Sequence, residues 1–223
     1  MGDKSIKRGG KPKMLKYIIF DFDGTLVDSK DHSIQVINQL AQKYQFENLT
    51  KEQTERLRHY SIAERCRMMN FPLYKIPFAL IDFLLLYKEG TDQLQLFPGI
   101  KELLTNLEDA NYKLAVISSN TEENIKQSLH TNKIENIDDI LVASIFGKDK
   151  VMKKFLKKHS LKASEVLYVG DELRDILACE RAGIKIAWVS WGFDSIEVTK
   201  KNKPDFYAHQ PQDIFSIAQS IGG

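Results

Sequence analysis

The sequence Lys16-Tyr17-Ile18-Ile19-Phe20-Asp21-Phe22-Asp23-Gly24-Thr25 begins as a short apolar run and changes at once to polar turn residues. Apolar runs of this length are typical of strands that are buried on both faces of a parallel sheet. In such sheets, ligands bind beyond the carboxyl ends of the strands. We therefore predict a strand over residues 16–20, followed by a functional site that contains Asp21 and Asp23.

The rest of the chain alternates between strand-like and helix-like segments. Four further apolar runs and a weaker one predict strands over residues 113–117, 140–145, 166–169, 184–189 and 205–208. Helical periodicity lies between them, over residues 99–110, 151–159 and 173–182. Alternation of this kind predicts an α/β fold whose core is a doubly wound (Rossmann-like) parallel sheet.

Residues 30–96 do not follow this alternation. No convincing strand occurs there, and helical periodicity returns in three segments that Pro72 and Pro77 punctuate. We predict a helical cap over residues 30–96, inserted after the first strand, and a core built from residues 14–29 and 97–223. Residues 1–13 are rich in lysine and glycine, which predicts a flexible basic leader.

Composition limits the classes of function. The 223 residues contain 32 Lys and Arg against 30 Asp and Glu, so the net charge is only +2. This balance predicts neither nucleic acid nor a membrane surface as a partner. The two cysteines, Cys66 and Cys179, are too few and too far apart for a disulfide framework or a cysteine zinc site. Because neither a signal peptide nor a bilayer-spanning apolar run is visible, we expect a cytoplasmic protein.

The two aspartates after the first strand suit phosphoryl transfer. A carboxylate nucleophile can form an aspartyl-phosphate, and a second carboxylate can protonate the leaving group and then activate water. Asp21 and Asp23 are two residues apart, so both can reach one site at the end of the strand. A turn rich in Asp and Gly is the competing interpretation, which the preceding apolar strand disfavours.

Three later segments carry matching chemistry, each at or just after the end of a predicted strand. Ser118-Ser119-Asn120 could donate hydrogen bonds to a phosphate, or could simply cap a helix. Lys148 or Lys150 could supply the cation that holds a nucleophile and a phosphate together. Gly170-Asp171-Glu172-Leu173-Arg174-Asp175 could complete a magnesium site of oxygen ligands, or could be an acid-rich helix start.

The four segments, in this order, resemble the motifs of the haloacid dehalogenase superfamily of phosphohydrolases. The resemblance implies Asp21 as nucleophile and magnesium ligand, and Asp23 as a general acid and base that also binds the metal through its backbone carbonyl. It implies Asp171 as a further metal ligand. True dehalogenases of this superfamily lack the second aspartate and need no metal, so Asp23 favours phosphoryl transfer with Mg²⁺ as cofactor.

The resemblance also assigns the remaining groups. It implies Ser118 as the phosphate-binding hydroxyl, with Ser119 beside it in a doublet that leaves a one-residue ambiguity. It favours Lys148 over Lys150 as the cation, although Asp149 stands where family members often have proline. Three residues are expected to support these groups: Thr25, Asn120 and Asp175.

Within the superfamily, the chain resembles the phosphoglycolate-phosphatase-like members, which have a small helical cap where residues 30–96 lie. Trp191-Gly192-Phe193 and Lys203-Pro204-Asp205 support that subgroup. The resemblance implies a phosphatase that acts on a small phosphorylated metabolite, as a monomer or a homodimer. A phosphomutase similar to β-phosphoglucomutase is one alternative, and a non-catalytic binding protein on the same fold is another.

Other prominent side chains are expected to have structural roles. Four cap arginines could contact an anion, but solvated helix faces are the simpler expectation: Arg56, Arg58, Arg65 and Arg67. Two histidines are expected at the surface, His32 and His59, and two tryptophans in packing contacts, Trp188 and Trp191.

Overall fold

The computed structural model describes residues 15–222 of the chain, so the predicted leader and Met14 lie outside the described residues. Six parallel strands form one sheet, in the order β3-β2-β1-β4-β5-β6. The strands are β1 (Tyr17–Phe20), β2 (Lys113–Ser118), β3 (Asp139–Val142), β4 (Val166–Gly170), β5 (Lys185–Val189) and β6 (Phe206–Ala208).

The order of the strands reverses at β1. From β1 the chain proceeds outward through β2 to β3, and it then returns to the other side of β1 for β4, β5 and β6. Phe20 of β1 is in register with Val116 of β2 and with Val169 of β4, so the carboxyl ends of these three strands lie side by side. Ligands of open α/β sheets bind at such a reversal. The predicted doubly wound α/β fold is confirmed.

Helices cover both faces of the sheet. α5 (Ile100–Asp109), α6 (Glu122–Thr131) and α9 (Pro211–Gly222) pack on one face, and α7 (Lys148–Lys158) and α8 (Leu173–Ala182) pack on the other. Successive strand residues point to opposite faces, and accordingly Ile18 and Phe20 join the first hydrophobic cluster while Ile19 joins the second. A strand between two helical layers needs apolar residues throughout, which explains the uninterrupted run in β1.

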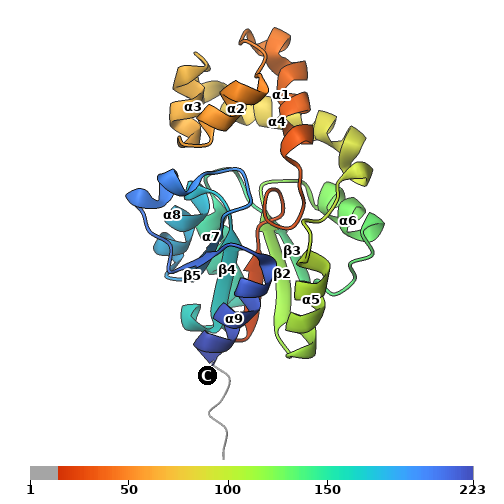
Figure 1. The fold of residues 1–223 in the computed structure, drawn as a ribbon, viewed down its shortest axis with the longest axis vertical. Helices are drawn as coiled ribbons and strands as arrows, with labels where there is room; N and C mark the ends of the chain where they lie inside the picture. Colours follow the sequence, from red (N-terminus) through yellow and green to blue (C-terminus); the bar gives the residue numbers. More distant parts are fainter. Residues whose placement is uncertain (1–14, 223) are drawn as a thin grey trace, which may run out of the picture.

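The cap is helical. Residues 30–96 form α1 (Lys30–Tyr44), α2 (Lys51–Leu57), α3 (Ile62–Met68), η1 (Leu73–Lys75), α4 (Ile76–Tyr87) and η2 (Lys88–Gln93), where η marks a 3₁₀ helix. Figure 1 shows the four α-helices of this segment gathered beyond one end of the sheet. The division at residues 30 and 96 stays our interpretation of this arrangement. Two further 3₁₀ helices lie in the core, η3 (Ala163–Glu165) and η4 (Ile196–Lys200).

Within residues 15–222, none of the helices is by itself long and apolar enough to cross a membrane. One pair, Ile62–Met68 with Leu73–Gln93, reaches that length and composition only across a bend of 114°.

Some element boundaries differ from the prediction. β3 ends at Val142, before the predicted end at residue 145, because the chain turns and the Gly147 N–H donates to the Ser144 carbonyl oxygen at 2.9 Å. The next helix, α7, therefore begins at Lys148 instead of residue 151. Helices α2 and α9 were not predicted, and α6 was expected only as a helix after Ser118-Ser119-Asn120, without bounds. The helix α2 is short, and its start depends on a capping box between Thr50 and Gln53.

Candidate active site

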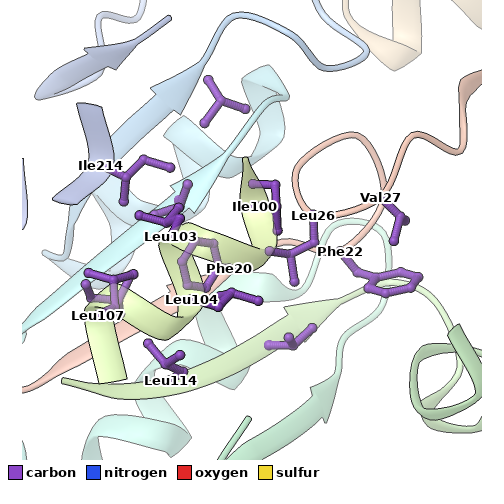
Figure 2. Close-up of a cluster of buried hydrophobic side chains, with 14 of the residues drawn as sticks. Phe20, Phe22, Leu26, Val27, Ile100, Leu103, Leu104, Leu107, Leu114 and Ile214 are labelled. Atoms are coloured by element: carbon purple, nitrogen blue, oxygen red, sulfur yellow. The ribbon is translucent and has the colours of Figure 1, made fainter. Parts of the chain in front are cut away.

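The loop after β1 is anchored by its own apolar residues. Phe22, Leu26 and Val27 are fully buried in the first hydrophobic cluster, together with residues of α5 and β2 (Figure 2). The Leu26 N–H donates to the Phe22 carbonyl oxygen at 2.9 Å, which closes the loop on itself. The loop is therefore fixed against the core, and it holds the alternate residues Asp21 and Asp23 beyond the carboxyl end of β1.

Asp171 follows β4 and approaches this loop closely. Its Oδ1 accepts a hydrogen bond from Thr25 Oγ1 at 2.8 Å, and its Oδ2 accepts one from the Phe193 N–H at 2.6 Å. Gly24 has a φ of +75°, and a Cβ there would lie 2.5 Å from Asp171 Oδ2. Only glycine suits this conformation and this close approach. The glycine of the first motif thus lets the loop and Asp171 meet.

Lys148 is the cation beside Asp21. Its Nζ lies 2.6 Å from Asp21 Oδ2 and 2.6 Å from Asp175 Oδ1, and it donates to the Tyr168 hydroxyl oxygen at 3.0 Å. Burial by itself would lower the pKa of Lys148, but the carboxylates of Asp175 and Asp21 outweigh burial and raise it. The Lys150 side chain is exposed, so of the two candidate lysines Lys148 is the one that the structure brings to Asp21.

Three buried aspartates, Asp21, Asp171 and Asp175, form what we call the carboxylate cluster. Each offers an oxygen within 4.8 Å of the oxygens of the other two. Burial raises the pKa of Asp171 well above its usual range, and the neighbouring carboxylates raise it further. Burial also raises the pKa of Asp175 to about 6, against the opposing effect of Lys148. Negative charge is thus concentrated here at a cost in free energy.

The cluster and its surroundings fit a divalent cation. The acids here outnumber the bases four to two: Asp21, Asp171, Glu172 and Asp175 against Lys148 and Arg174. A +2 ion would balance this difference, and Mg²⁺ prefers oxygen ligands such as carboxylates. The donor set therefore suits the magnesium that the motifs predict. The cluster adds Asp175 to the predicted carboxylate ligands Asp21 and Asp171. Asp23 is predicted to bind through its backbone carbonyl, and that stays a prediction.

The Asp23 carboxylate is held from both the core and the cap. Asn120 Nδ2 donates to Asp23 Oδ2 at 2.9 Å, and the Tyr87 hydroxyl donates to Asp23 Oδ1. Asn120 is fixed in turn, since its Oδ1 accepts from Asn124 Nδ2 at 2.9 Å. Tyr87 stands at the end of cap helix α4 and is fully buried; burial and the nearby Asp23 raise the pKa of Tyr87 far above its usual value. The sequence reasoning missed Tyr87, whose only signal is its place on the apolar face of α4.

The serine doublet divides its contacts. Ser118 is buried and its Oγ accepts from the Asn120 N–H at 3.2 Å, whereas Ser119 Oγ accepts from Arg174 Nη1 at 3.1 Å. The N-cap of the following helix α6 is Thr121, whose side chain accepts from a backbone N–H of the first turn. Neither serine is the N-cap of α6, which removes the main competing interpretation of this motif.

Two cap arginines bind the core instead of facing solvent. Arg58 donates to the carbonyl oxygens of Gly192 and Phe193, each at 3.0 Å, and Arg65 pairs with the buried Asp194. The expectation of solvated charges is wrong for these two. The exposed cap arginines, as expected, are Arg56 and Arg67. Because the Phe193 N–H binds Asp171, the cap is docked on the segment that also holds a predicted metal ligand.

The histidines differ from each other. His59 is exposed as expected, with its Nδ1 2.8 Å from the Ser195 hydroxyl oxygen. His32 is half-buried, contrary to the expectation, because its ring packs 4.6 Å from the Tyr87 ring and its Nε2 lies 2.8 Å from the Tyr87 carbonyl oxygen. His32 thus helps to hold the cap tyrosine that reaches Asp23.

The tryptophans pack as expected and also hold the backbone of the site. Trp188 is fully buried, and its Nε1 donates to the Asp171 carbonyl oxygen at 2.8 Å. Trp191 Nε1 donates to the Thr25 carbonyl oxygen at 3.2 Å. Both indoles therefore fix main-chain atoms next to predicted site residues.

Known proteins resemble this chain in sequence. A family model described as haloacid dehalogenase-like hydrolase matches residues 18–189. A phosphoglycolate phosphatase from Synechococcus elongatus is 28% identical over 209 residues, which cover 93% of this chain and 99% of that protein. The pyrophosphatase PpaX from Bacillus mycoides is 21% identical over 212 residues, which cover 92% of this chain and 98% of that protein. The predicted resemblance to phosphoglycolate-phosphatase-like members is confirmed.

Solved structures share the fold. A haloacid dehalogenase-like family hydrolase from Streptococcus pneumoniae matches with a TM-score of 0.77 at 24% identity, over 92% of this chain and 98% of that one. CbbY from Rhodobacter sphaeroides, solved in complex with phosphate, matches with a TM-score of 0.69 at 16% identity, over 90% and 96%. The predicted phosphatase of the haloacid dehalogenase type is confirmed at the level of the family: the chain belongs to the haloacid dehalogenase-like hydrolases.

Proposed function

We propose that this hydrolase releases phosphate from a small phosphate monoester, through an aspartyl-phosphate on Asp21 and with Mg²⁺ as cofactor. The observation that carries the proposal is the buried contact of 2.6 Å between Asp21 and Lys148. A carboxylate that attacks a phosphate must approach another anion, and a fixed cation beside it offsets the repulsion. Asp23, two residues on, is held separately by Asn120 and Tyr87.

The proposed reaction has two steps. In the first, an Asp21 oxygen attacks the phosphorus atom, the bond to the leaving oxygen breaks, and Asp23 gives its proton to that oxygen. In the second, Asp23 takes a proton from water while the water oxygen attacks phosphorus, and the bond to Asp21 breaks. Lys148 offsets the negative charge beside Asp21 in both steps. Tyr87 and Asn120 orient Asp23 for the two proton transfers.

Mg²⁺, when bound, would supply positive charge to the transferring phosphoryl group. The carboxylates of Asp21 and Asp171 and the backbone carbonyl of Asp23 would hold it, with Asp175 beside them. Ser118 or Ser119, with the N–H groups at the start of α6, would bind phosphoryl oxygens.

The test is phosphate release from a panel of phosphorylated metabolites, with and without Mg²⁺. Phosphoglycolate and pyrophosphate enter the panel first, because they are the substrates named for two relatives. Asp21→Asn should release no phosphate, and Asp28→Asn, which alters an exposed carboxylate of the same loop, should behave like the wild type. Acid-quenched wild type should carry phosphate on the peptide that contains Asp21. Turnover by Asp21→Asn would contradict the proposal, and an isomerised sugar phosphate in place of free phosphate would indicate a mutase.

A further inference from the structure

A cavity of about 350 Å³ lies between the cap and the proposed reaction site. At the core end it is lined by Asp23, Ser119 and Arg174, so it opens directly on the proposed acid. Its volume is within the range of pockets that hold small organic ligands, roughly 300–1,000 Å³. We call this space the cap cavity. The residues that line the rest of it indicate which leaving group could bind there.

Most of the wall on the cap side is apolar. It is built from α1, the α1–α2 connection, α3 and α4, and its side chains include Ile34, Ile37, Leu49, Ile62, Leu80 and Phe83. These six are only partly buried, although they point into the cap interior. An apolar molecule that enters such a pocket removes apolar surface from water, so the lining favours apolar ligands. The cap therefore has a hollow apolar interior that connects with the site.

Each cation on the cavity wall contacts an acid of the protein, although Lys30 and Arg58 share Glu55. Four reach the wall, and each contacts an acid: Lys30 and Arg58 contact Glu55, Arg65 contacts Asp194, and Arg174 contacts Glu172. Among the described residues that line the cavity, no cation lacks such a partner. An ionised leaving group would have to compete with these acids for a cation, whereas an uncharged apolar one would not.

We propose that the preferred ester carries an uncharged, apolar leaving group that fills the cap cavity, and not a small ionised one such as glycolate. This inference rests on the proposed function, because the phosphate itself is taken to react at Asp21. The phosphate end would lie at the core, and the hydrocarbon would extend past Asp23 into the cap. Asp23 borders the cavity and would then protonate the leaving oxygen where the two parts join.

A series of 1-alkyl phosphates from methyl to octyl tests the inference. Their leaving groups have similar basicity, so differences in kcat/KM report contact with the cavity. Each buried methylene should raise kcat/KM about threefold to fourfold until the cavity is full, and phosphoglycolate should fall below the longer alkyl esters. Equal kcat/KM along the series, or a preference for phosphoglycolate, overturns the inference while leaving the proposed function intact.

A variant that fills the cavity sharpens the test. Ala79 lines the cavity from α4, so Ala79→Phe should shift the preferred chain length toward shorter esters. The control is Gln39→Phe, which adds the same side chain at an exposed position of α1 and should leave the profile unchanged. Binding of 1-hexanol to Asp21→Asn, followed by calorimetry, tests the cavity without turnover. The inference is supported if 1-hexanol binds and Ala79→Phe abolishes that binding. It is overturned if 1-hexanol does not bind, even if no ester is hydrolysed.

The outer face of α4 carries an independent observation. Phe78, Ile81 and Leu85 of α4 are 64%, 61% and 66% exposed, and Tyr74 of η1, directly before α4, is 73% exposed; the four are spaced 4, 3 and 4 residues apart. This spacing places them on one side of the helix, opposite the side that lines the cavity, and it is the spacing of a helix–helix seam. A helix that is apolar on all sides is normally covered.

We infer that this stripe packs against the same stripe of a second copy, with the two α4 helices antiparallel. A two-fold axis between Phe78 and Ile81 would set Phe78 of each copy against Ile81 of the other and Tyr74 against Leu85, so the stripe is self-complementary. Lys75 and Asp82 border one edge of the stripe. Asp82 Oδ2 already lies 2.5 Å from Lys43 Nζ within its own copy, and the antiparallel arrangement brings Lys75 of the other copy toward the same carboxylate.

Analytical ultracentrifugation of the full chain tests this dimer. The wild type should sediment at twice the chain mass of 25.6 kDa, and Phe78→Glu should sediment as a monomer with unchanged helical circular dichroism. Ile196→Glu, which alters another exposed apolar residue, should remain a dimer. A wild type that is monomeric at all accessible concentrations, or a Phe78→Glu variant that still dimerises, overturns the inference. Binding of the stripe to lipid vesicles instead of a second copy also overturns the inference.

Discussion

The Nζ of Lys148 lies 2.6 Å from Asp21 Oδ2, and both side chains are buried. The two residues are 127 positions apart in sequence, and they meet because α7 begins at Lys148 and directs the side chain toward the end of β1. Lys148 also contacts Asp175, so one cation compensates two buried carboxylates.

Lys148→Met should abolish phosphate release and lower the free energy of unfolding by about 3–5 kcal/mol. Removal of one partner from a buried ion pair leaves the other charge uncompensated, which is the costly case. Urea unfolding and a phosphate-release assay measure the two effects. Lys150→Met, at an exposed position two residues on, should change neither. The double variant Lys148→Met/Asp175→Asn should recover part of the stability and no activity, and a Lys148→Met protein of wild-type stability would contradict the argument.

Asp194 should make stability depend on pH. It lies on the segment where the cap docks, and burial raises its pKa to about 6, against the effect of Arg65 and with a contribution from Glu172. A folded-state pKa above the unfolded value means that the folded protein binds the extra proton. The stabilisation is therefore complete below about pH 4, the unfolded value, and is lost as the pH rises through about 6.

The measurement is the difference in the free energy of unfolding between the wild type and Asp194→Asn at several pH values from 4 to 7. Carboxylates that do not interact with Asp194 contribute equally to both proteins and cancel. The wild type should lose stability relative to the variant as the pH rises, by at most about 3 kcal/mol. A difference that is flat or has the opposite sign would show that Arg65 outweighs burial.

Much of the core was predictable because its signals are local. The run before Asp21 predicts β1 since a strand covered on both faces needs no polar residue, and the motifs stand where strands end. Parallel strands bring those ends together, so the meeting of Asp21 with Asp171 followed from topology alone. The choice between Lys148 and Lys150 depended on the turn after β3, because that turn sets where α7 begins. A turn of this kind follows no periodic pattern in the sequence.

The contacts between cap and core were not predictable in the same way. Tyr87, Arg58 and Arg65 lie on helices whose own pattern is visible, but their partners depend on how the cap is docked. Arginines on short polar helices are usually solvated, and we therefore expected Arg58 and Arg65 to be solvated. The expectation failed because both arginines contact the core. A local pattern contains no information on the orientation of one helical unit relative to a sheet.

Addition of Mg²⁺ to chelator-treated protein should raise the free energy of unfolding. A ligand that binds only the folded state stabilises it by about 2.7 kcal/mol at a hundred times its dissociation constant. The carboxylate cluster supplies the buried oxygen donors, so Asp171→Asn should reduce the effect and Asp28→Asn should not. Urea unfolding at constant ionic strength measures this increase in the free energy of unfolding independently of activity. Equal stabilisation of the wild type and Asp171→Asn would place the ion elsewhere.

Tyr87→Phe should lower kcat and leave KM nearly unchanged. The Tyr87 hydroxyl donates to Asp23 Oδ1, whereas Asn120 holds only the other oxygen, so the variant should leave the proposed acid free to rotate. A hydrogen bond to a charged group contributes about 1.5–3 kcal/mol, which corresponds to a decrease in kcat of roughly tenfold to a hundredfold. Steady-state kinetics measure the split between kcat and KM.

The matched control for that variant is Tyr17→Phe, which removes a hydroxyl that contacts His159 in the core, away from Asp23. It should retain the wild-type kcat. Because Tyr87 belongs to the cap and Asp23 to the core, the proposed acid is oriented fully only when the cap is docked. If Tyr87→Phe raises KM and leaves kcat unchanged, Tyr87 serves to bind the leaving group, and the orientation of Asp23 then depends on Asn120 alone.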